Sequence, residues 1–297
     1  MTRRPLWVDA DGVRVAGMTP DVDLSGGPLV IALHGGGYTS AYFDVPGHSL
    51  LDEAARLGVR AIALDRPNYG DSDALPNDET TFRRNASVLD TAIAHVWKDY
   101  AAHHDGVVLV GHSIGGAICV HLAGRQPAWP LLGIAISGIH DAAPDKVRGA
   151  WAAMPEGVPV ELTDEQRRMF FYGPDWTIES DIVARATVSA AAIPLAELLE
   201  VVGRWTDEAA SLAADVRVPV QYIAFEFERL WCIDNASVRA FAGCFTGAPE
   251  VRCELMTGIG HDADHHRNGR AFQLRQLSFA LDCAHRSSRP VSTRVSP

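Results

Sequence analysis

The sequence around Ser113 constrains the fold more than any other stretch of the chain. A run of apolar, mostly β-branched residues at 106–110 precedes this serine and predicts a buried strand. A run of small residues at 117–123 follows it and predicts a helix. Gly111 and Gly115 stand two residues before and after the serine, where a larger side chain would clash with the strand or the helix. The pattern Gly-x-Ser-x-Gly in this setting predicts a sharp strand–turn–helix that presents Ser113 as a nucleophile.

Strands and helices alternate through most of the remaining chain. Residues 6–16 predict a hairpin, because Asp11-Gly12 at its centre suits the positive φ of a tight turn. Further strands are expected at 28–33, 59–64, 131–137, 218–225 and 251–256, and further helices at 50–57, 82–100, 236–245 and 272–284. This alternation predicts an α/β fold with a mostly parallel central sheet and helices on both faces.

The alternation stops between residues 142 and 214, where only helical pieces are visible. Helices are expected from Thr163 onward, over 182–192 and over 194–202. This segment also gathers aromatic residues, which either line a pocket or pack the segment onto the core: Trp151, Phe170, Phe171, Tyr172, Trp176 and Trp205. We therefore expect a core of residues 1–141 and 215–286, a helical cap of 142–214, and a disordered polar tail of 287–297.

The charge balance restricts the partners of the chain. Its 26 basic and 37 acidic side chains give a net charge of −11, which argues against nucleic acid and anionic membranes as partners. No apolar run approaches the roughly 20 residues of a membrane span, and no signal-peptide pattern opens the sequence. The five cysteines show no CxxC spacing. We expect a cytoplasmic protein that acts on a small molecule; a homodimer is left open.

Four short motifs follow successive strands and together resemble the α/β-hydrolase superfamily. They are His34–Gly37, Asp65–Ser72, Gly111–Gly116 and Gly258–His261. The resemblance covers roughly residues 6–284. It implies the α/β-hydrolase fold, a helical cap after the sixth strand, and a catalytic triad in the order serine, acid, histidine. No cofactor is expected.

The residues themselves fit this chemistry. A serine hydroxyl needs a base to take its proton, and His261 is the candidate base because it lies on a glycine-flanked loop after a strand. Two backbone N–H groups are needed for an oxyanion hole, and we expect them from Ile114 and Gly36, with Gly37 as the alternative to Gly36. Further contacts with substrate are expected from Gly37, Tyr38 and His112, although Tyr38 could instead simply pack.

The acid of the triad is left open by the sequence. The resemblance implies Gly-x-x-Asp shortly after the strand at 218–224, but this chain reads Phe-Glu-Phe-Glu at 225–228. Glu228 occupies the matching position and is the favoured candidate. Glu226, Asp234 and Asp141 are the alternatives, and a further interpretation is that the two glutamates only coat a solvated loop.

Two other charged features allow more than one interpretation. The stretch His261–His266 holds histidines and aspartates at short spacing, but the adjacent His265 and His266 cannot easily face one ion, so no metal site is expected. Arg66 suits either a substrate carboxylate or a salt bridge between loops, and the salt bridge is the favoured interpretation.

These observations predict a serine hydrolase that cleaves an ester, thioester or lactone of a small to medium, largely apolar acyl compound. The same groups also suit acyl transfer, cyclisation or C–C bond cleavage, because each proceeds through a similar oxyanion. A non-catalytic binding protein on the same fold is the alternative from another class. A serine instead of an aspartate at position 113 argues against epoxide hydrolase or dehalogenase chemistry.

Overall fold

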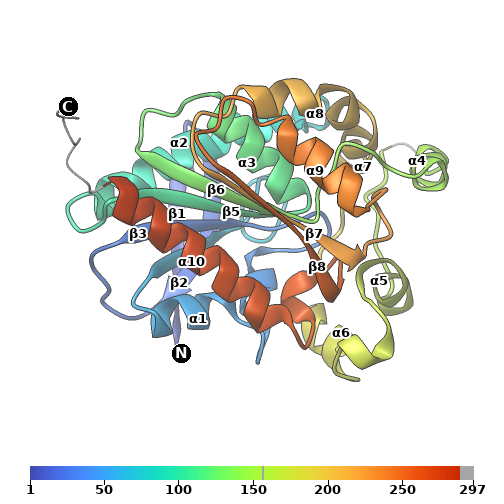
Figure 1. The fold of residues 1–297 in the computed structure, drawn as a ribbon, viewed down its shortest axis with the longest axis horizontal. Helices are drawn as coiled ribbons and strands as arrows, with labels where there is room; N and C mark the ends of the chain where they lie inside the picture. Colours follow the sequence, from blue (N-terminus) through green and yellow to red (C-terminus); the bar gives the residue numbers. More distant parts are fainter. Residues whose placement is uncertain (156, 288–297) are drawn as a thin grey trace, which may run out of the picture.

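One eight-stranded sheet runs through the centre of the molecule. Figure 1 shows the computed structural model, which describes residues 1–155 and 157–287. The spatial order of the strands is β1-β2-β4-β3-β5-β6-β7-β8. Their bounds are β1 (Arg3–Ala10), β2 (Val13–Pro20), β3 (Pro28–Leu33), β4 (Arg60–Leu64), β5 (Gly106–His112), β6 (Leu131–Ser137), β7 (Val220–Phe227) and β8 (Val251–Gly260).

The pairing of the strands confirms the predicted mostly parallel sheet. Strand β2 is antiparallel to both β1 and β4, and every pair from β4 to β8 is parallel. Asp11 and Gly12 join the first two strands with φ of 54° and 85°, as the hairpin turn requires. All residues of β3 and β5 are buried, which explains their continuous apolar sequences.

Helices cover both faces of the sheet. In Figure 1, α1 (Leu50–Arg56) and α10 (Gly269–Ser287) lie on one face, and α2 (Phe82–Tyr100), α3 (Ile114–Gly124) and α8 (Arg204–Ala214) lie on the other. Helix α9 (Asn235–Gly243) packs against β8. Ser49 and Thr81 are the N-cap residues of α1 and α2, and their side chains accept hydrogen bonds from backbone N–H groups of the first turn.

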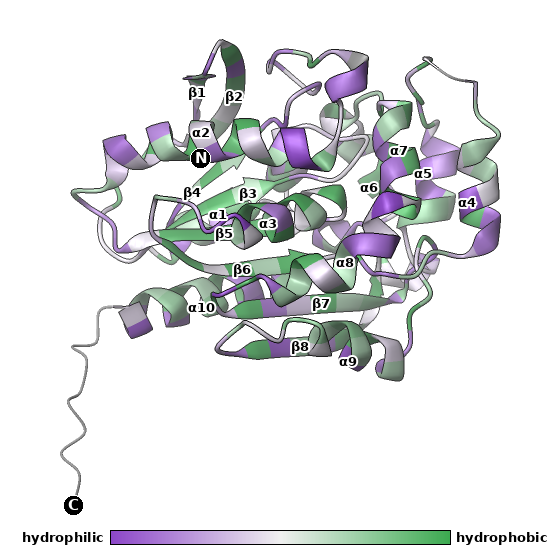
Figure 2. Ribbon diagram, turned by 90° about the horizontal axis from the view of Figure 1, so that it is seen from above, coloured by the Kyte–Doolittle hydropathy of each residue, from purple (hydrophilic) through white to green (hydrophobic). Residues whose placement is uncertain are grey.

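The segment between β6 and β7 is helical, as the sequence predicts. Its helices α4 (Asp145–Ala152), α5 (Asp164–Phe171), α6 (Ile182–Ala186) and α7 (Leu195–Val202) gather beyond the carboxyl ends of the parallel strands (Figures 1 and 2). Helix α8, the last of this segment, packs against α3 on the sheet. The boundary of a separate cap at residue 214 stays a prediction.

Among the expected element boundaries that differ from the structure, two have an identifiable cause. The helix expected over 182–192 ends at Ala186 and continues only as a 3-10 turn, because Ala190 forms an isolated β-bridge with Tyr38. Strand β8 does not end at Met256 but continues to Gly260, because its pairing with β7 shifts register after Met256 and resumes between Gly260 and Phe227. The 3-10 helices are η1 (Ser40–Asp44), η2 (Asn77–Glu79), η3 (Asp175–Thr177), η4 (Thr187–Ser189) and η5 (Ala263–His265).

Helix α10 closes the described part of the chain. It extends to Ser287, the first residue of the expected disordered tail, and the other tail residues, 288–297, lie outside the described residues. Within residues 1–155 and 157–287, no helix has the length and apolar character to cross a bilayer. The hydropathy colouring in Figure 2 places the most apolar segments on the central strands.

Candidate active site

Ser113 stands at the turn between β5 and α3 in a strained conformation. Its φ of 53° and ψ of −125° lie outside the regions that side-chain-bearing residues favour. The Ser113 N–H donates to the carbonyl of Ser137 on the neighbouring strand at 2.8 Å, which fixes the turn. A Cβ at Gly115 would lie 2.1 Å from the carbonyl oxygen of Leu33, so only glycine allows the helix to start this close to the sheet.

The register of β7 and β8 brings Glu228 and His261 together. Phe227 pairs with Gly260 after the irregularity in the strand pair, so the residues that follow them emerge side by side. The Nδ1 atom of His261 lies 2.8 Å from Oε2 of Glu228. The other carboxylate oxygen accepts the backbone N–H groups of Arg229 and Leu230 at 2.9 and 3.0 Å. The carboxylate is therefore fixed on both sides.

This pairing sets the protonation of the imidazole. Burial disfavours a charged His261, but the charge and hydrogen bond of Glu228, with a contribution from Asp262, raise its pKa above the ordinary value. Because the carboxylate accepts from Nδ1–H, a neutral His261 carries its lone pair on Nε2. The ring can then take a proton at Nε2 and keep the resulting charge beside Glu228.

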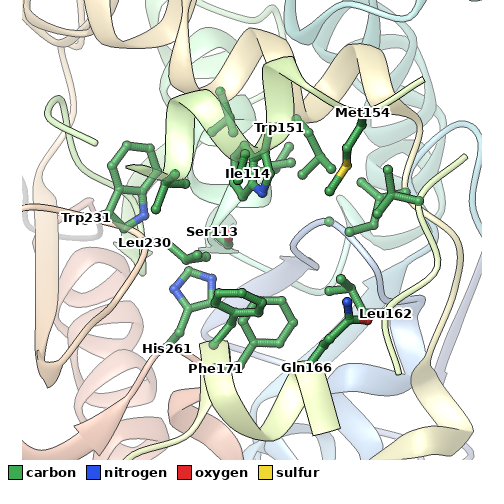
Figure 3. A pocket seen from close by; sticks show the side chains of 18 of the residues that line it. Ser113, Ile114, Trp151, Met154, Leu162, Gln166, Phe171, Leu230, Trp231 and His261 are labelled. Atoms are coloured by element: carbon green, nitrogen blue, oxygen red, sulfur yellow. The ribbon is translucent and has the colours of Figure 1, made fainter. Parts of the chain in front are cut away.

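Ser113 and His261 both face one cavity of about 340 Å³ (Figure 3). Its wall is almost entirely apolar, and α4, α5, α7 and the loop after β7 supply most of it: Val147, Ala150, Trp151, Phe170, Phe171, Leu198, Val201, Leu230 and Trp231. Among the described residues, Ser113 Oγ makes no direct hydrogen bond to the imidazole. Such bonds are often formed only when substrate is bound.

Two backbone N–H groups stand next to the serine. Ile114 is the first residue of α3, so its N–H has no acceptor within the helix. The N–H of Gly36 likewise donates to no acceptor in the described part of the chain. Both residues line the cavity with Ser113. These are the two expected oxyanion-hole residues, and the structure brings them together with the serine.

The other three candidate acids lie elsewhere. The carboxylate of Glu226 accepts the N–H of Gly258 at 2.8 Å on the exposed end of the sheet. Asp234 caps α9 by accepting two backbone N–H groups. Asp141 lies 3.3 Å from the imidazole of His140. Among the four candidates, Glu228 is the one that meets His261.

Three residues that the sequence predicts to contact substrate do not line the cavity: Gly37, Tyr38 and His112. Tyr38 is buried, and its hydroxyl donates to Asp262 behind His261. His112 stacks on the ring of Tyr42 at 4.7 Å and lies 4.9 Å from the ring of His261. Gly37 packs beside Ile193. Burial lowers the pKa of His112 well below its ordinary value, so the ring is a neutral support under the site.

The histidines and aspartates that follow His261 are hydrogen-bonded within the protein. His266 Nε2 accepts the N–H groups of Gly173 and Gly260, and His265 Nε2 lies 3.1 Å from the carbonyl of Tyr42. Over the described ranges, no three His, Cys, Asp or Glu side chains gather in a way that could hold a metal ion. These rings instead fix the loop that carries His261.

The sequence identified only part of the cavity wall. Of the aromatic residues singled out, Trp151, Phe170 and Phe171 line the cavity. Trp205, which donates to the carbonyl of His140, and Tyr172, which is buried beside His266, belong to the packing. Trp176 is 67% exposed and contacts Phe227 at the surface.

The loop after β7 supplies two wall residues that the sequence did not reveal. Leu230 and Trp231 line the cavity, and the indole N–H of Trp231 donates to the carbonyl of Gly138 at 2.9 Å. No periodic pattern marked this loop as a wall. The loop begins directly after Glu228, and the position of Glu228 beside His261 follows from the register of β7 and β8.

Comparisons with known proteins agree with this architecture. Protein phosphatase methylesterase 1 of Pongo abelii is 28% identical over 115 residues, which are 39% of this chain and 28% of that protein. A putative non-heme haloperoxidase of Mycobacterium phage D29 is 33% identical over 118 residues, which are 40% of this chain and 37% of the phage protein. The matched residues thus span 28% of the first relative and 37% of the second.

Solved structures match over nearly the whole chain. A thermophilic esterase from Thermogutta terrifontis superposes with a TM-score of 0.65 at 18% identity, covering 94% of this chain and 99% of the esterase. Proline iminopeptidase of Mycobacterium smegmatis gives 0.68 at 18% identity, covering 96% and 100%. At this identity the likeness shows a shared fold. The model of the alpha/beta hydrolase family matches residues 30–273, and the chain therefore belongs to that family of enzymes.

Proposed function

We propose that the chain is a serine hydrolase that cleaves an ester, thioester or lactone of a small to medium, largely apolar acyl compound. The observation that carries the proposal is the apolar cavity faced by both Ser113 and His261, with Glu228 bonded to the far side of the imidazole. Ser113 is the nucleophile, His261 is the general base, and Glu228 orients the base.

The first half of the reaction forms an acyl-enzyme. Ser113 Oγ attacks the substrate carbonyl while Nε2 of His261 takes the hydroxyl proton. The carbonyl oxygen becomes negative and is stabilised by the N–H groups of Ile114 and Gly36. The tetrahedral intermediate then collapses. His261 gives its proton to the leaving alcohol or thiol, and the acyl group stays on Ser113.

The second half releases the acid. A water molecule attacks the acyl-enzyme while His261 takes its proton at Nε2, and the same two N–H groups stabilise the second oxyanion. Collapse returns the proton to Ser113 Oγ. If an alcohol or amine takes the place of water, the product is a transferred acyl group, so analysis of products with and without an added alcohol separates hydrolysis from acyl transfer.

The relatives support ester chemistry in general terms. The matched proteins include a methylesterase, and the superposed structures include a thermophilic esterase and a thioesterase domain. The apolar wall supports the acyl class, because each buried methylene contributes about 0.8 kcal/mol of binding. Lys146 is the one cationic side chain on that wall as far as the structure describes the chain.

A fluorophosphonate probe tests the proposal directly. We expect the probe to modify the folded protein once, at Ser113, and to abolish hydrolysis of p-nitrophenyl butanoate. Intact mass and peptide mapping measure the labelling, and the Ser113→Ala variant is the control. Folded protein whose mass stays unchanged, with no esterase activity on acetate to octanoate esters, contradicts the proposal.

The cavity wall predicts how acyl length is selected. In the wild type, kcat/KM should rise about fourfold for each added methylene until the cavity is full. A Leu198→Trp substitution narrows the cavity, so kcat/KM for an octanoate ester should fall by about tenfold or more while the acetate ester changes little. Leu199→Trp is the matched control, because Leu199 lies on the same helix and is 39% exposed. Identical chain-length profiles in the two variants contradict this assignment of the wall.

A further inference from the structure

Side chains from distant parts of the sequence hold the backbone carbonyls of the loop at 34–37. The guanidinium of Arg66 donates from Nε to the carbonyl of His34 at 2.9 Å and from Nη2 to that of Gly35 at 3.3 Å. Arg167 of α5 donates to the carbonyl of Gly37 at 3.1 Å. The loop that carries one expected oxyanion donor is thus fixed from outside.

The contact with Gly35 determines where the next N–H points. The carbonyl of Gly35 and the N–H of Gly36 belong to one planar trans peptide and point in opposite directions. Because Arg66 holds the oxygen on one side, the N–H of Gly36 is turned to the other side. Gly36 lines the cavity beside Ser113, and its N–H is unpaired among the described residues.

His34 adds a second donor to the same carbonyl. Its Nδ1 lies 2.8 Å from the oxygen of Gly35, and its Nε2 accepts the backbone N–H of Arg66 at 3.1 Å. This arrangement needs a neutral ring with the proton on Nδ1. Burial and the charge of Arg66 lower the pKa of His34 well below its ordinary value, in agreement with that tautomer.

Arg66 is itself held by a carboxylate of α7. Its Nη1 and Nη2 donate to the two oxygens of Glu197 at 2.7 and 3.1 Å, and the hydroxyl of Tyr69 donates to the same carboxylate at 2.6 Å. All three side chains are buried, with no more than 2% exposed. The favoured interpretation of Arg66 as a salt-bridge residue agrees with this contact, but its partner lies on helix α7 and not on a second loop.

The helix that provides Glu197 also walls the cavity. Leu198 and Val201 of α7 line the cavity, so one short helix contacts both the acyl space and, through Arg66, the peptide of Gly35. A buried ion pair seldom adds net stability, because desolvation offsets the attraction between the charges. A contribution to fold stability alone therefore does not explain a buried Arg66–Glu197 ion pair beside the loop at 34–37.

We propose that Arg66 and Glu197 are positioning residues, which keep the peptide between Gly35 and Gly36 turned for oxyanion binding and tie that orientation to the cavity wall. The inference rests on the proposed hydrolase reaction. An oxyanion exists only after attack, so loss of its donor lowers kcat and leaves KM nearly unchanged. A purely structural pair predicts no such split.

The test replaces both charges together. The double variant Arg66→Met, Glu197→Leu leaves no unpaired buried charge and should fold, with a somewhat lower melting temperature because the buried Tyr69 hydroxyl loses its acceptor. We expect its kcat on p-nitrophenyl butanoate to fall about 10- to 100-fold, with KM changed less than threefold. Affinity for butylboronic acid, which forms a tetrahedral adduct with the serine, should fall in parallel.

Two single variants complete the experiment. Arg66→Lys keeps the charge next to Glu197 but cannot supply the forked donors that reach both carbonyls, so it should lower kcat in the same way. Glu200→Gln is the matched control, because Glu200 lies on the same helix but accepts the N–H of Phe82 at the start of α2 and bonds to no residue of the loop at 34–37. Its kcat should match that of the wild type.

The outcomes separate the inference from the proposed function. Wild-type kcat and boronic acid affinity in the folded double variant overturn the inference and leave the hydrolase intact. If the double variant does not fold, Arg66→Lys replaces it in the test: a kcat equal to that of the wild type overturns the inference, and a lowered kcat supports it. A wild type that neither hydrolyses esters nor reacts with fluorophosphonate removes the proposed function, and the inference with it.

Discussion

Replacing Ser113 with alanine should lower kcat on a p-nitrophenyl ester by roughly 10⁵-fold or more, because the acyl-enzyme can no longer form. The fold should be unaffected, since the turn depends on the backbone bond to Ser137 and on the flanking glycines. Circular dichroism and thermal unfolding check the fold, and steady-state kinetics checks the activity.

A second substitution at the same position separates chemistry from strain. Ser113→Gly should be equally inactive, yet more stable than the wild type by about 1–2 kcal/mol, because glycine adopts the backbone angles of this turn without steric cost. Ser278→Gly is the control, since this exposed serine lies within α10. There glycine should destabilise the protein by about 0.5 kcal/mol and leave kcat unchanged.

Each part of this prediction has a distinct contrary result. Ser113→Ala with more than a hundredth of the wild-type kcat removes the serine from the proposed role. Ser113→Gly that is less stable than the wild type shows that the turn is not strained in the way its φ of 53° indicates.

The sequence predicted the layers of this fold well because most of its signals are local. The central strands β3 and β5 are continuous apolar runs, and each turn residue suits its own φ, so the hairpin at Asp11-Gly12 and the turn at Ser113 needed no tertiary information. The helix expected over 182–192 failed for the opposite reason. Its last residues pair with Tyr38, a distant partner that overrides local preference.

In the candidate site, too, the residues marked by local motifs were predictable and those that depend on distant contacts were not. Ser113 and His261 follow from motifs at the ends of strands, but the acid depended on an irregularity between β7 and β8 that no periodic pattern marks. The sequence predicts contacts with substrate from Tyr38 and His112. In the structure Tyr38 bonds to Asp262, His112 stacks on Tyr42, and neither lines the cavity, because the direction of these side chains depends on tertiary packing.

Replacing Glu228 with glutamine should reduce kcat by about 10³- to 10⁴-fold while the protein stays folded. The amide keeps the shape of the side chain, but it carries no charge to stabilise the imidazolium and can present its NH₂ group to Nδ1. In that case the proton of the ring moves to Nε2, where the base is needed. Glu226→Gln is the matched control, because that glutamate lies two residues earlier and bonds only to the N–H of Gly258.

The pH profile gives the same prediction an independent readout. His261 must be neutral to accept a proton, so kcat/KM rises with pH through the pKa of this ring in the free enzyme. Glu228 raises that pKa against the opposing effect of burial. Removing its charge should therefore lower the pKa and move the acid limb of the residual activity to lower pH, whereas Glu226→Gln should leave the limb in place. An acid limb that stays fixed in Glu228→Gln, with kcat within tenfold of the wild type, means that another carboxylate orients His261 during the reaction.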